Sequence, residues 1–354
     1  MRILVVNAGS SSLKLRLLGT DDEVLRSADT TPEDLDDVLA AWPSPDAVGH
    51  RVVHGGTEFT EPVVVDARVR DALGELTELA PLHQPKSLAG LDAVSRLLPD
   101  VPAVACFDTA FHTTLPPEAA TYAIPREWRE RYAIRRYGFH GLSHAYCSAR
   151  VGTVLGRTDA RVVTCHLGAG ASLAAVVGGR SVDTTMGFTP LEGLVMATRS
   201  GTVDPGLVLW LAERMPAAEI AEALEKHSGL SALAGTPDLR EVRVAAEGGD
   251  PDAVLALDVY VHRIAGGIAA MAASAGGLDA LAFTGGVGEN SALIRSRTAE
   301  RLAFLGVAVS DERNNNGDED ITADGCEIRT LVVAAREDLE IARGTRTALL
   351  TGSR

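Results

Sequence analysis

The chain has 354 residues, a length that predicts two domains because a single hydrophobic core rarely extends that far. Hydrophobic residues make up 46% of the sequence and charged residues 23%, a composition typical of soluble globular proteins. The formal net charge of -15 at pH 7 argues against nucleic acid or an anionic membrane as partner, since both attract basic surfaces. An anionic ligand must therefore meet a local cluster of positive groups.

The first residues, MRILVVNAGSSSLKLRLL, predict a hairpin. Residues 3–6 form an apolar run typical of a strand buried on both faces, and residues 13–17 alternate as in a half-buried strand. The turn at 7–12 gathers glycine, serine and asparagine, whose donors suit a phosphate, and Lys14 adds a positive charge. The same residues are common in ordinary turns, so the turn alone leaves both interpretations open.

Comparison of the chain with itself aligns residues 2–18 with residues 161–177 without a gap. Each copy reads as a strand, a turn of small residues and a second strand, which predicts two duplicated halves that face a shared cleft. Strand patterns at 47–56 and 101–112 alternate with helical spacing at 86–100, and this alternation predicts an α/β fold. Later in the chain we expect a helix at 205–214 capped by Asp204 and a helix at 251–275 capped by Asp250. Residues 278–306 predict a strand, a glycine-rich turn and a helix, and residues 313–325 a polar surface loop. Residues 330–350 predict a last strand and a terminal helix.

The four cysteines are scattered and have no CxxC spacing, which predicts reduced thiols in a cytoplasmic protein. They are Cys106, Cys147, Cys165 and Cys326. The apolar segment after Arg2 is too short for a signal peptide, and no apolar run is expected to span a membrane.

Several motifs can carry chemistry. Gly286-x-Gly288-x-x-Ser291 nearly fits a dinucleotide fingerprint, and Asp311 lies near the usual distance of a ribose-binding acid. The third position is serine, so the narrower interpretation is a turn where a nucleotide approaches the backbone, with a nicotinamide-dependent dehydrogenase as the alternative.

Charged residues follow or end predicted strands. Arg51 and Arg199 lie beside glycines, where a guanidinium can bind a carboxylate or phosphoryl group through two hydrogen bonds. Asp108 and Glu337 each follow an apolar strand, at the edge where α/β sheets place ligands, and either carboxylate could hold Mg²⁺ or cap a helix. His140 and His144 have zinc-like spacing, but no third ligand is indicated.

Taken in order, eight stretches closely resemble the acetate kinase family of short-chain carboxylate kinases. They are NAGSSSLK, GHRVVHGG, PLHQPKSLAG, FDTAFHTTLP, RRYGFHGLSH, CHLGAGASL, DTTMGFTPLEGLVMATRSGTVDPG and FTGGVGENS. The resemblance implies duplicated ribonuclease-H-like domains of the actin and hexokinase type with the active site in the cleft between them. It implies an N-terminal domain of residues 1–110 and 340–354, and a C-terminal domain of residues 111–339 that carries a homodimer interface.

The resemblance also implies an activity: reversible transfer of the ATP γ-phosphoryl group to acetate, and to propionate as well, giving acetyl phosphate and ADP. The cofactor would be Mg²⁺, with Mn²⁺ as an alternative, and neither nucleic acid nor membrane would be a partner. The catalytic residues would be Arg51, Asp108, His140 and Arg199. His140, Arg199 and also His144 would support the transition state. The carboxylate would bind among Arg51, Val53, Leu82, Phe139 and Pro190, and the metal at Asn7 and Glu337.

Nucleotide binding is implied along both hairpins and the late glycine motif. The residues that match are Ser10, Ser12, Lys14, His166, Gly168, Gly170, Asp238, Arg240, Gly286, Gly288, Glu289 and Asn290. Four positions depart from the family pattern: Ala169 replaces an asparagine, Ala335 and Arg336 replace threonine and asparagine, and Gln84 replaces an asparagine, a milder change. The alternatives are therefore a kinase for a longer acid such as butyrate, a kinase for another donor such as pyrophosphate, to which Arg336 could contribute, or a nucleotide-binding protein without phosphotransfer.

Overall fold

The computed structural model describes residues 1–8, 13–32, 34–81 and 83–351. Its contacts divide the chain into two compact units: unit 1 comprises Met1–Thr113, Phe139–Tyr146 and Arg336–Arg354, and unit 2 comprises Thr114–Gly138 and Cys147–Ala335. The segment Phe139–Tyr146, assigned to the second half from sequence, belongs to unit 1. It is held there because the Gly141 amide donates to the Asp108 carbonyl at 2.8 Å, and a His112 ring nitrogen lies 3.0 Å from the Phe139 carbonyl.

Unit 1 is built on a six-stranded sheet of order β3-β2-β1-β4-β6-β5 within the described residues. The predicted hairpin is β1 (Ile3–Ala8) with antiparallel β2 (Leu13–Leu18). The other strands are β3 (Val24–Thr30), β4 (Ala47–Val52), β5 (Val63–Val64) and β6 (Ala103–Phe107). Strand β4 runs parallel to β1 and β6 runs parallel to β4, so their carboxyl ends share one edge of the sheet.

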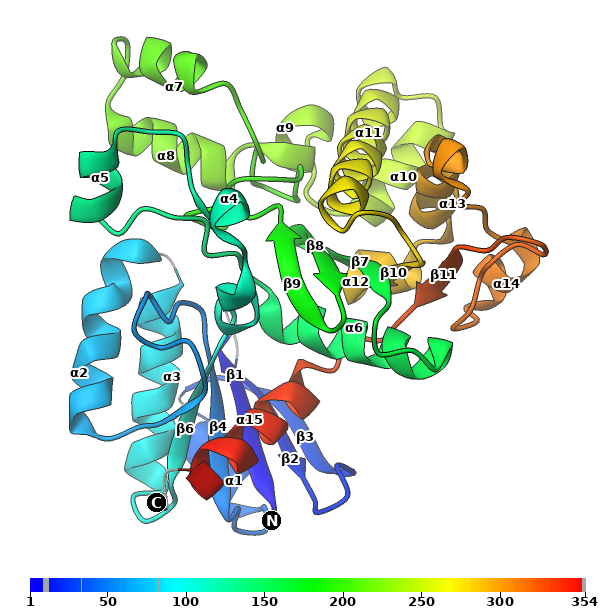
Figure 1. The fold of residues 1–354 in the computed structure, drawn as a ribbon. Helices are drawn as coiled ribbons and strands as arrows, with labels where there is room; N and C mark the ends of the chain where they lie inside the picture. Colours follow the sequence, from blue (N-terminus) through cyan, green and yellow to red (C-terminus); the bar gives the residue numbers. More distant parts are fainter. Residues whose placement is uncertain (9–12, 33, 82, 352–354) are drawn as a thin grey trace. The chain divides into compact units, whose positions relative to one another are not determined.

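Strand β1 is buried on both faces, as its apolar run predicts. Ile3 and Val5 pack in a core with Ile341 of α15 (Glu337–Thr351), whereas Leu4 and Val6 pack in a second core with Val94 of α3 (Gln84–Leu97). In Figure 1, α15 crosses the strands in red, while α2 (Ala67–Glu75) and α3 stand together beside the sheet. The remaining helices of unit 1 are α1 (Leu35–Ala40), η1 (Leu76–Leu79) and η2 (Ala110–Thr114), the last ending one residue into unit 2.

Unit 2 repeats the same topology. Its described sheet has the order β11-β10-β7-β8-β9, with antiparallel β7 and β8 as the hairpin and β10 and β11 parallel to β7. The bounds are β7 (Arg161–Leu167), β8 (Ala171–Val177), β9 (Arg180–Thr184), β10 (Ala280–Thr284) and β11 (Arg329–Val332). Strands β7 to β11 correspond in order to β1, β2, β3, β4 and β6, so the predicted duplication and α/β class are confirmed.

The long helix of unit 2 is α11 (Pro251–Ser274), which the Asp250 side chain caps by accepting from the amides of Asp252 and Ala253. Among the described residues it is the one helix whose length and composition would allow a membrane span, which corrects the expectation of none. Ten of its residues are buried, and the helix packs on β7 and β8. It is therefore a core helix of this unit.

Shorter helices complete unit 2, and two of them differ from expectation. Residues 285–290, expected as a turn, form α12 (Gly285–Asn290), and the polar segment expected as a loop begins with α14 (Asp311–Asn316), which Ser310 caps. Helix α6 (Gly141–Leu155) runs from unit 1 into unit 2. The others are α4 (Pro117–Ala120), α5 (Arg126–Arg131), α7 (Pro205–Ala212), α8 (Ala217–Lys226), α9 (Gly229–Ala234), α10 (Leu239–Glu247), α13 (Ala292–Arg301) and η3 (Ala303–Leu305).

Candidate active site

In unit 1 the structure brings together four residues that the sequence singled out. Arg51, near the end of β4, donates from Nε to Asp108 Oδ1 at 3.0 Å and from Nη2 to Asp108 Oδ2. Its Nη1 donates to Asn7 Oδ1 at 3.2 Å, and its Nε lies 3.9 Å from Glu337 Oε2. Asn7 Nδ2 in turn donates to Glu337 Oε2 at 3.3 Å. A guanidinium thus lies among three oxygen-bearing side chains at the carboxyl edge of the sheet.

The electrostatics of this cluster keep Arg51 charged. Burial lowers the pKa of its guanidinium, but Asp108 and Glu337 raise the pKa by more, so the net value lies above the ordinary one. The Asp108 side chain is 2% exposed and the Arg51 side chain 19% exposed. Since a buried charge is costly unless it is paired, the Asp108 carboxylate holds the guanidinium in one orientation.

Three histidine rings of unit 1 pack on one another, His140 on His144 and His144 on His112. His140 precedes α6 and has φ of +57°, a left-handed conformation that costs a non-glycine residue about 1–2 kcal/mol. The ring centroids of His140 and His144 are 6.5 Å apart, and those of His144 and His112 are 5.6 Å apart. His112 and His144 are fully buried, and burial lowers the pKa of His112 to about 4. Within the described residues no three His, Cys, Asp or Glu side chains are placed to bind a metal together.

The proposed apolar pocket residues are distributed over both units. Val53 is 6% exposed and Phe139 1% exposed, both in unit 1, and the Phe139 ring packs edge-on against His54 with centroids 5.5 Å apart. Pro190 is half-buried in unit 2. Leu82, Ser10 and Ser12 lie outside the described residues. Lys14 is exposed on β2, opposite Asn7 in the hairpin register.

In unit 2, Arg199 lies in the long loop between β9 and α7. Its Nη1 donates to the Pro190 carbonyl at 2.7 Å, and this bond joins two residues that the sequence placed at the reacting centre. Burial lowers the pKa of Arg199, and Glu225 opposes that shift. The loop also contacts the second hairpin turn, because the Ala197 amide donates to the Ala169 carbonyl at 3.1 Å. This contact uses the backbone of Ala169, so it does not depend on the side chain at that position.

The nucleotide-side residues of unit 2 are largely engaged with their own backbone. The Glu289 carboxylate accepts from the amides of Gly285 at 3.0 Å and Ala335 at 2.9 Å, and Asn290 Nδ2 donates to the Gly286 carbonyl at 2.8 Å. The buried Arg295 donates to the carbonyls of Gly288 and Glu289. These bonds fix the orientation of α12 after β10. His166 lies one residue before the end of β7, opposite Ser172, and the turn after β7 is closed because the Gly168 amide donates to the Gly170 carbonyl at 2.9 Å.

Two further candidates contact each other. Asp238 caps α10 and accepts from the Arg240 amide and guanidinium, which lowers the pKa of Asp238 to about 2. The Arg240 side chain is 88% exposed.

Arg336, one of the departures from the family pattern, donates from Nε to Asp338 Oδ1 at 3.0 Å, and Asp338 also accepts from Arg16. The charge of Arg336 is thus paired on α15.

Four polar residues hold these candidates in place, and sequence reasoning noted only one of them, Gln84, as a mild departure from the family pattern without a structural role. Gln84 is buried and bonds both the amide and the carbonyl of His54, next to Val53. Arg136 and Tyr122 both donate to Glu192, which lies in the loop that carries Pro190, and the Tyr122 hydroxyl also accepts from the Phe188 amide of that loop. The motifs RRYGFHGLSH and FTPLEGLVMATRSG contain Arg136 and Glu192, but nothing in their spacing indicates that the two side chains meet.

Comparison with known proteins identifies the family. The model of the acetokinase family matches residues 33–343. The chain belongs to this family. An acetate kinase from Fervidobacterium nodosum is 43% identical over 400 aligned residues, covering 99% of this chain and 98% of the relative. A crystal structure of a propionate kinase from Francisella tularensis superposes with a TM-score of 0.93 at 37% identity, covering 98% of this chain and 99% of that one. A crystal structure of Porphyromonas gingivalis acetate kinase superposes with a TM-score of 0.89 at 36% identity, covering 98% of this chain and 99% of that one.

Membership in the acetokinase family makes the protein an enzyme, a phosphotransferase with a carboxyl group as acceptor. This excludes the dehydrogenase interpretation of the glycine motif, which forms α12 after a strand of the duplicated sheet. It also favours phosphotransfer over nucleotide binding alone. The family pairs a short-chain carboxylate with ATP or ADP.

Proposed function

We propose that this protein transfers the γ-phosphoryl group of ATP to acetate, giving acetyl phosphate and ADP reversibly, and that it also accepts propionate. The observation that carries this proposal is the Arg51 cluster, where one charged guanidinium lies 3.2 Å from Asn7 Oδ1 and 3.9 Å from Glu337 Oε2. The Arg51 guanidinium, which can bind the acceptor carboxylate or the phosphoryl group, thereby lies beside side-chain oxygens that can bind a metal ion. Phosphoryl transfer to a carboxylate uses both a positively charged side chain and a metal ion.

The residue types suit a reaction without a strong base. An acetate oxygen is already a nucleophile at neutral pH, so catalysis consists of in-line positioning and charge neutralisation. Arg51, Arg199 and His140 would neutralise the moving phosphoryl group, and Asp108 and His144 would orient Arg51 and His140. The two hydrogen bonds that Arg51 donates to the Asp108 carboxylate and the packing of the His140 and His144 rings support these assignments.

Mg²⁺ fits the donors at Asn7 and Glu337, with Mn²⁺ as an alternative. Both side chains offer hard oxygen atoms, and the hydrogen bond from Asn7 Nδ2 to Glu337 Oε2 at 3.3 Å keeps the two side chains next to each other. Mg²⁺ is commonly bound by one or two protein oxygens together with phosphates and water. When bound, the metal would supply charge neutralisation at the phosphates.

ATP would contact the two hairpin turns through Ser10, Ser12, Lys14, His166, Gly168 and Gly170. Gly286, Gly288, Glu289 and Asn290 would lie along the adenosine, with Asp238 and Arg240 near the base or ribose. The exposed guanidinium of Arg240 is accessible to a ligand, whereas Glu289 would act through the backbone it holds. Val53, Leu82, Phe139 and Pro190 would take the methyl end of the acceptor. One methylene changes binding in such a pocket by only about 1–3 kcal/mol, which is why propionate is included.

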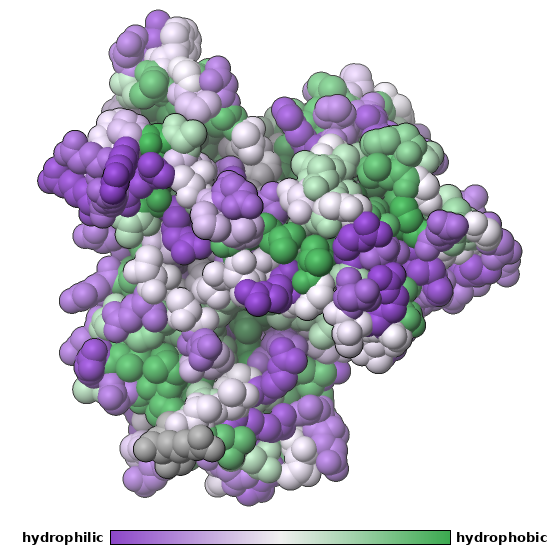
Figure 2. All heavy atoms as spheres, in the orientation of Figure 1, coloured by the Kyte–Doolittle hydropathy of each residue, from purple (hydrophilic) through white to green (hydrophobic). Residues whose placement is uncertain are grey.

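A cytoplasmic homodimer completes the proposal. Cys106, Cys147 and Cys165 are free and fully buried, as expected for a protein kept in a reducing compartment. Val254 and Leu255 of α11 are 41% and 52% exposed. Figure 2 shows hydrophobic residues over this helix, among hydrophilic neighbours. A second copy that packs on α11 would cover this apolar surface.

The test is formation of acyl phosphate, trapped with hydroxylamine, from Mg·ATP and a series of acids. We expect product with acetate and propionate, a lower kcat/KM with butyrate, none with pyrophosphate as donor, and loss of activity with EDTA that Mg²⁺ restores. A higher kcat/KM with butyrate than with acetate would assign the protein to a longer acceptor. Product with pyrophosphate in place of ATP would assign a different donor.

A further inference from the structure

The loop that carries Pro190 and Arg199 has no helix or strand between Thr184 and Pro205. Every residue from 185 to 201 is nevertheless buried or half-buried. Buried backbone without regular structure needs hydrogen-bond partners from elsewhere, and long loops of this kind are usually functional. The question is which side chains hold this loop in one conformation.

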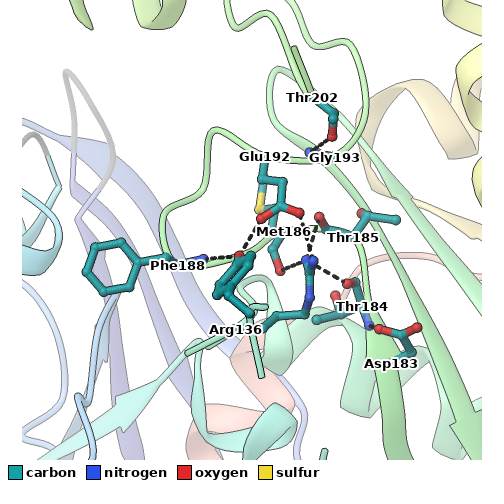
Figure 3. A network of polar contacts seen from close by, with 10 residues as sticks. Arg136, Asp183, Thr184, Thr185, Met186, Phe188, Glu192, Gly193 and Thr202 are labelled. Atoms are coloured by element: carbon teal, nitrogen blue, oxygen red, sulfur yellow. Dashed lines mark hydrogen bonds and ion pairs between the residues drawn. The ribbon is translucent and has the colours of Figure 1, made fainter. Parts of the chain in front are cut away.

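Arg136 supplies hydrogen bonds to three successive carbonyls at the start of the loop. Its Nη1 donates to the carbonyls of Thr184, Thr185 and Met186 at 3.2, 3.1 and 3.1 Å, and its Nη2 donates to Glu192 Oε1 at 2.7 Å. Figure 3 shows the guanidinium with its bonds to these carbonyls and to Glu192. Burial lowers the pKa of Arg136, but Tyr122 and Glu192 raise it by more, so the guanidinium remains charged.

Tyr122 joins the other side of the loop to the same carboxylate. Its hydroxyl donates to Glu192 Oε2 and accepts from the Phe188 amide at 2.9 Å. Burial and Glu192 raise the pKa of Tyr122, so the hydroxyl keeps the proton it donates. Gly187 is required between them, because a Cβ there would overlap both the Glu192 carboxylate and the Tyr122 hydroxyl.

These contacts fix the loop on both sides of Pro190, at Phe188 and at Glu192. Pro190 in turn accepts from Arg199 Nη1 at 2.7 Å. Farther along, Gly193 and Thr202 exchange two hydrogen bonds, Gly193 N to Thr202 Oγ1 at 3.1 Å and Thr202 N to Gly193 O at 3.0 Å, which close the base of the segment containing Arg199 (Figure 3). The Arg136 guanidinium is thus linked to the Arg199 guanidinium: Arg136 bonds Glu192, Glu192 lies two residues from Pro190 in the loop, and the Pro190 carbonyl accepts from Arg199.

We propose that Arg136, together with Glu192 and Tyr122, is a positioning unit that sets where Pro190 and Arg199 meet the acceptor carboxylate. This inference rests on the proposed function, since it concerns how that acceptor is held. The three residues act through the loop and not through the nucleotide. Their loss should therefore raise KM for acetate and lower kcat while KM for ATP stays unchanged.

The experiment compares four variants in the hydroxylamine assay, with acetate and ATP varied separately. Tyr122→Phe removes one hydroxyl and Glu192→Gln one charge, and Arg136→Lys keeps the charge but loses the planar fork. Arg161→Lys is the matched control, because Arg161 also bonds a carboxylate and a backbone carbonyl, those of Asp279 and Gly276, at the start of β7 in the same unit.

We expect KM for acetate to rise about 10-fold in Tyr122→Phe and kcat/KM for acetate to fall about 100-fold in Arg136→Lys, the size of loss that misplacement by about 1 Å can cause. KM for ATP should stay within about twofold, and the kinetics of Arg161→Lys should match the parent. Equal changes in both KM values, or parent-like kinetics in Tyr122→Phe, would overturn the inference while the parent's activity upholds the proposed function. An inactive parent would overturn the proposed function and this inference with it. If Arg136→Lys does not fold, Tyr122→Phe decides.

Discussion

The Asp108 carboxylate should hold Arg51 by a buried ion pair whose loss affects both stability and catalysis. Asp108→Asn keeps the shape of the side chain but removes its charge and places an amide NH₂ against one guanidinium N–H. The Asp108 side chain is 2% exposed, so water cannot replace the lost acceptor. We therefore expect Asp108→Asn to destabilise unit 1 and to release Arg51 from its orientation toward Asn7 and Glu337.

The magnitude follows from burial. Removing one partner of a buried ion pair costs about 3–5 kcal/mol, and a retained amide oxygen recovers about 1 kcal/mol, which leaves about 2–4 kcal/mol. For a unit of this size that is a fall in Tm of about 5–15 °C. Misorientation of a guanidinium at the reacting centre should lower kcat by about 100-fold.

A matched control is available in the same unit. Arg70 and Asp92 form the same bidentate geometry, with both distances 2.7 Å, but their side chains are 32% and 36% exposed. Asp92→Asn should therefore cost less than about 1 kcal/mol and leave kcat unchanged. Thermal unfolding and the hydroxylamine assay on both variants decide the matter. Equal losses of Tm in the two variants, or parent-like kcat in Asp108→Asn, would refute the reasoning.

Three further predictions follow from single features. Burial lowers the pKa of His50, His54 and His112 to about 4, so the unfolded chain binds protons near pH 6.5 that unit 1 accepts only near pH 4. The free energy of unfolding should therefore fall as pH drops from about 6.5 to about 4, by about 1.4 kcal/mol per pH unit for each of the three imidazoles. In urea unfolding at a series of pH values, His50→Gln should reduce the slope of this free energy against pH by about a third. An unchanged slope against pH would contradict this. Gly187→Ala should cost about 1–3 kcal/mol and reduce activity with acetate, whereas Gly266→Ala in α11, where a Cβ meets open space, should be neutral or stabilising in the same thermal melts; equal effects would count against the steric argument. Arg336→Asn should keep ATP kinetics within about twofold and show no use of pyrophosphate, because Asp338 already pairs with this guanidinium; a change of donor would show that Arg336 contacts the phosphates.

Much of the fold could be predicted because local patterns determine it. The apolar run at 3–6 predicted a strand buried on both faces, and the alternation at 13–17 predicted a strand buried on one face. The match of the chain with itself predicted the repeated hairpin. Asp250 before Pro251 marked the start of α11 to the residue. In contrast, α12 was hidden because its glycines favour a turn, and its glycine-rich backbone is also bonded to side chains: Glu289 accepts from the amides of Gly285 and Ala335, and Arg295 donates to the Gly288 carbonyl.

The candidate site was predictable where residues lie at strand ends. Arg51, Asp108 and Asn7 follow from the parallel arrangement of β1, β4 and β6, which brings their carboxyl ends to one edge. The left-handed φ of His140 and the contact of Arg136 with Glu192 depend on tertiary packing between segments far apart in sequence. No periodicity encodes such contacts, so the supporting side chains could not be found from the chain alone.

The most direct test of the account is acetyl phosphate formation by the parent and by Arg199→Ala, with Arg214→Ala as a control for loss of a partly exposed arginine in the same unit. The account predicts activity in the parent and in Arg214→Ala, and a fall in kcat of about 10³-fold or more in Arg199→Ala with thermal unfolding retained. Parent-like activity in a folded Arg199→Ala, or no acetyl phosphate from the parent with Mg·ATP and acetate, would contradict it.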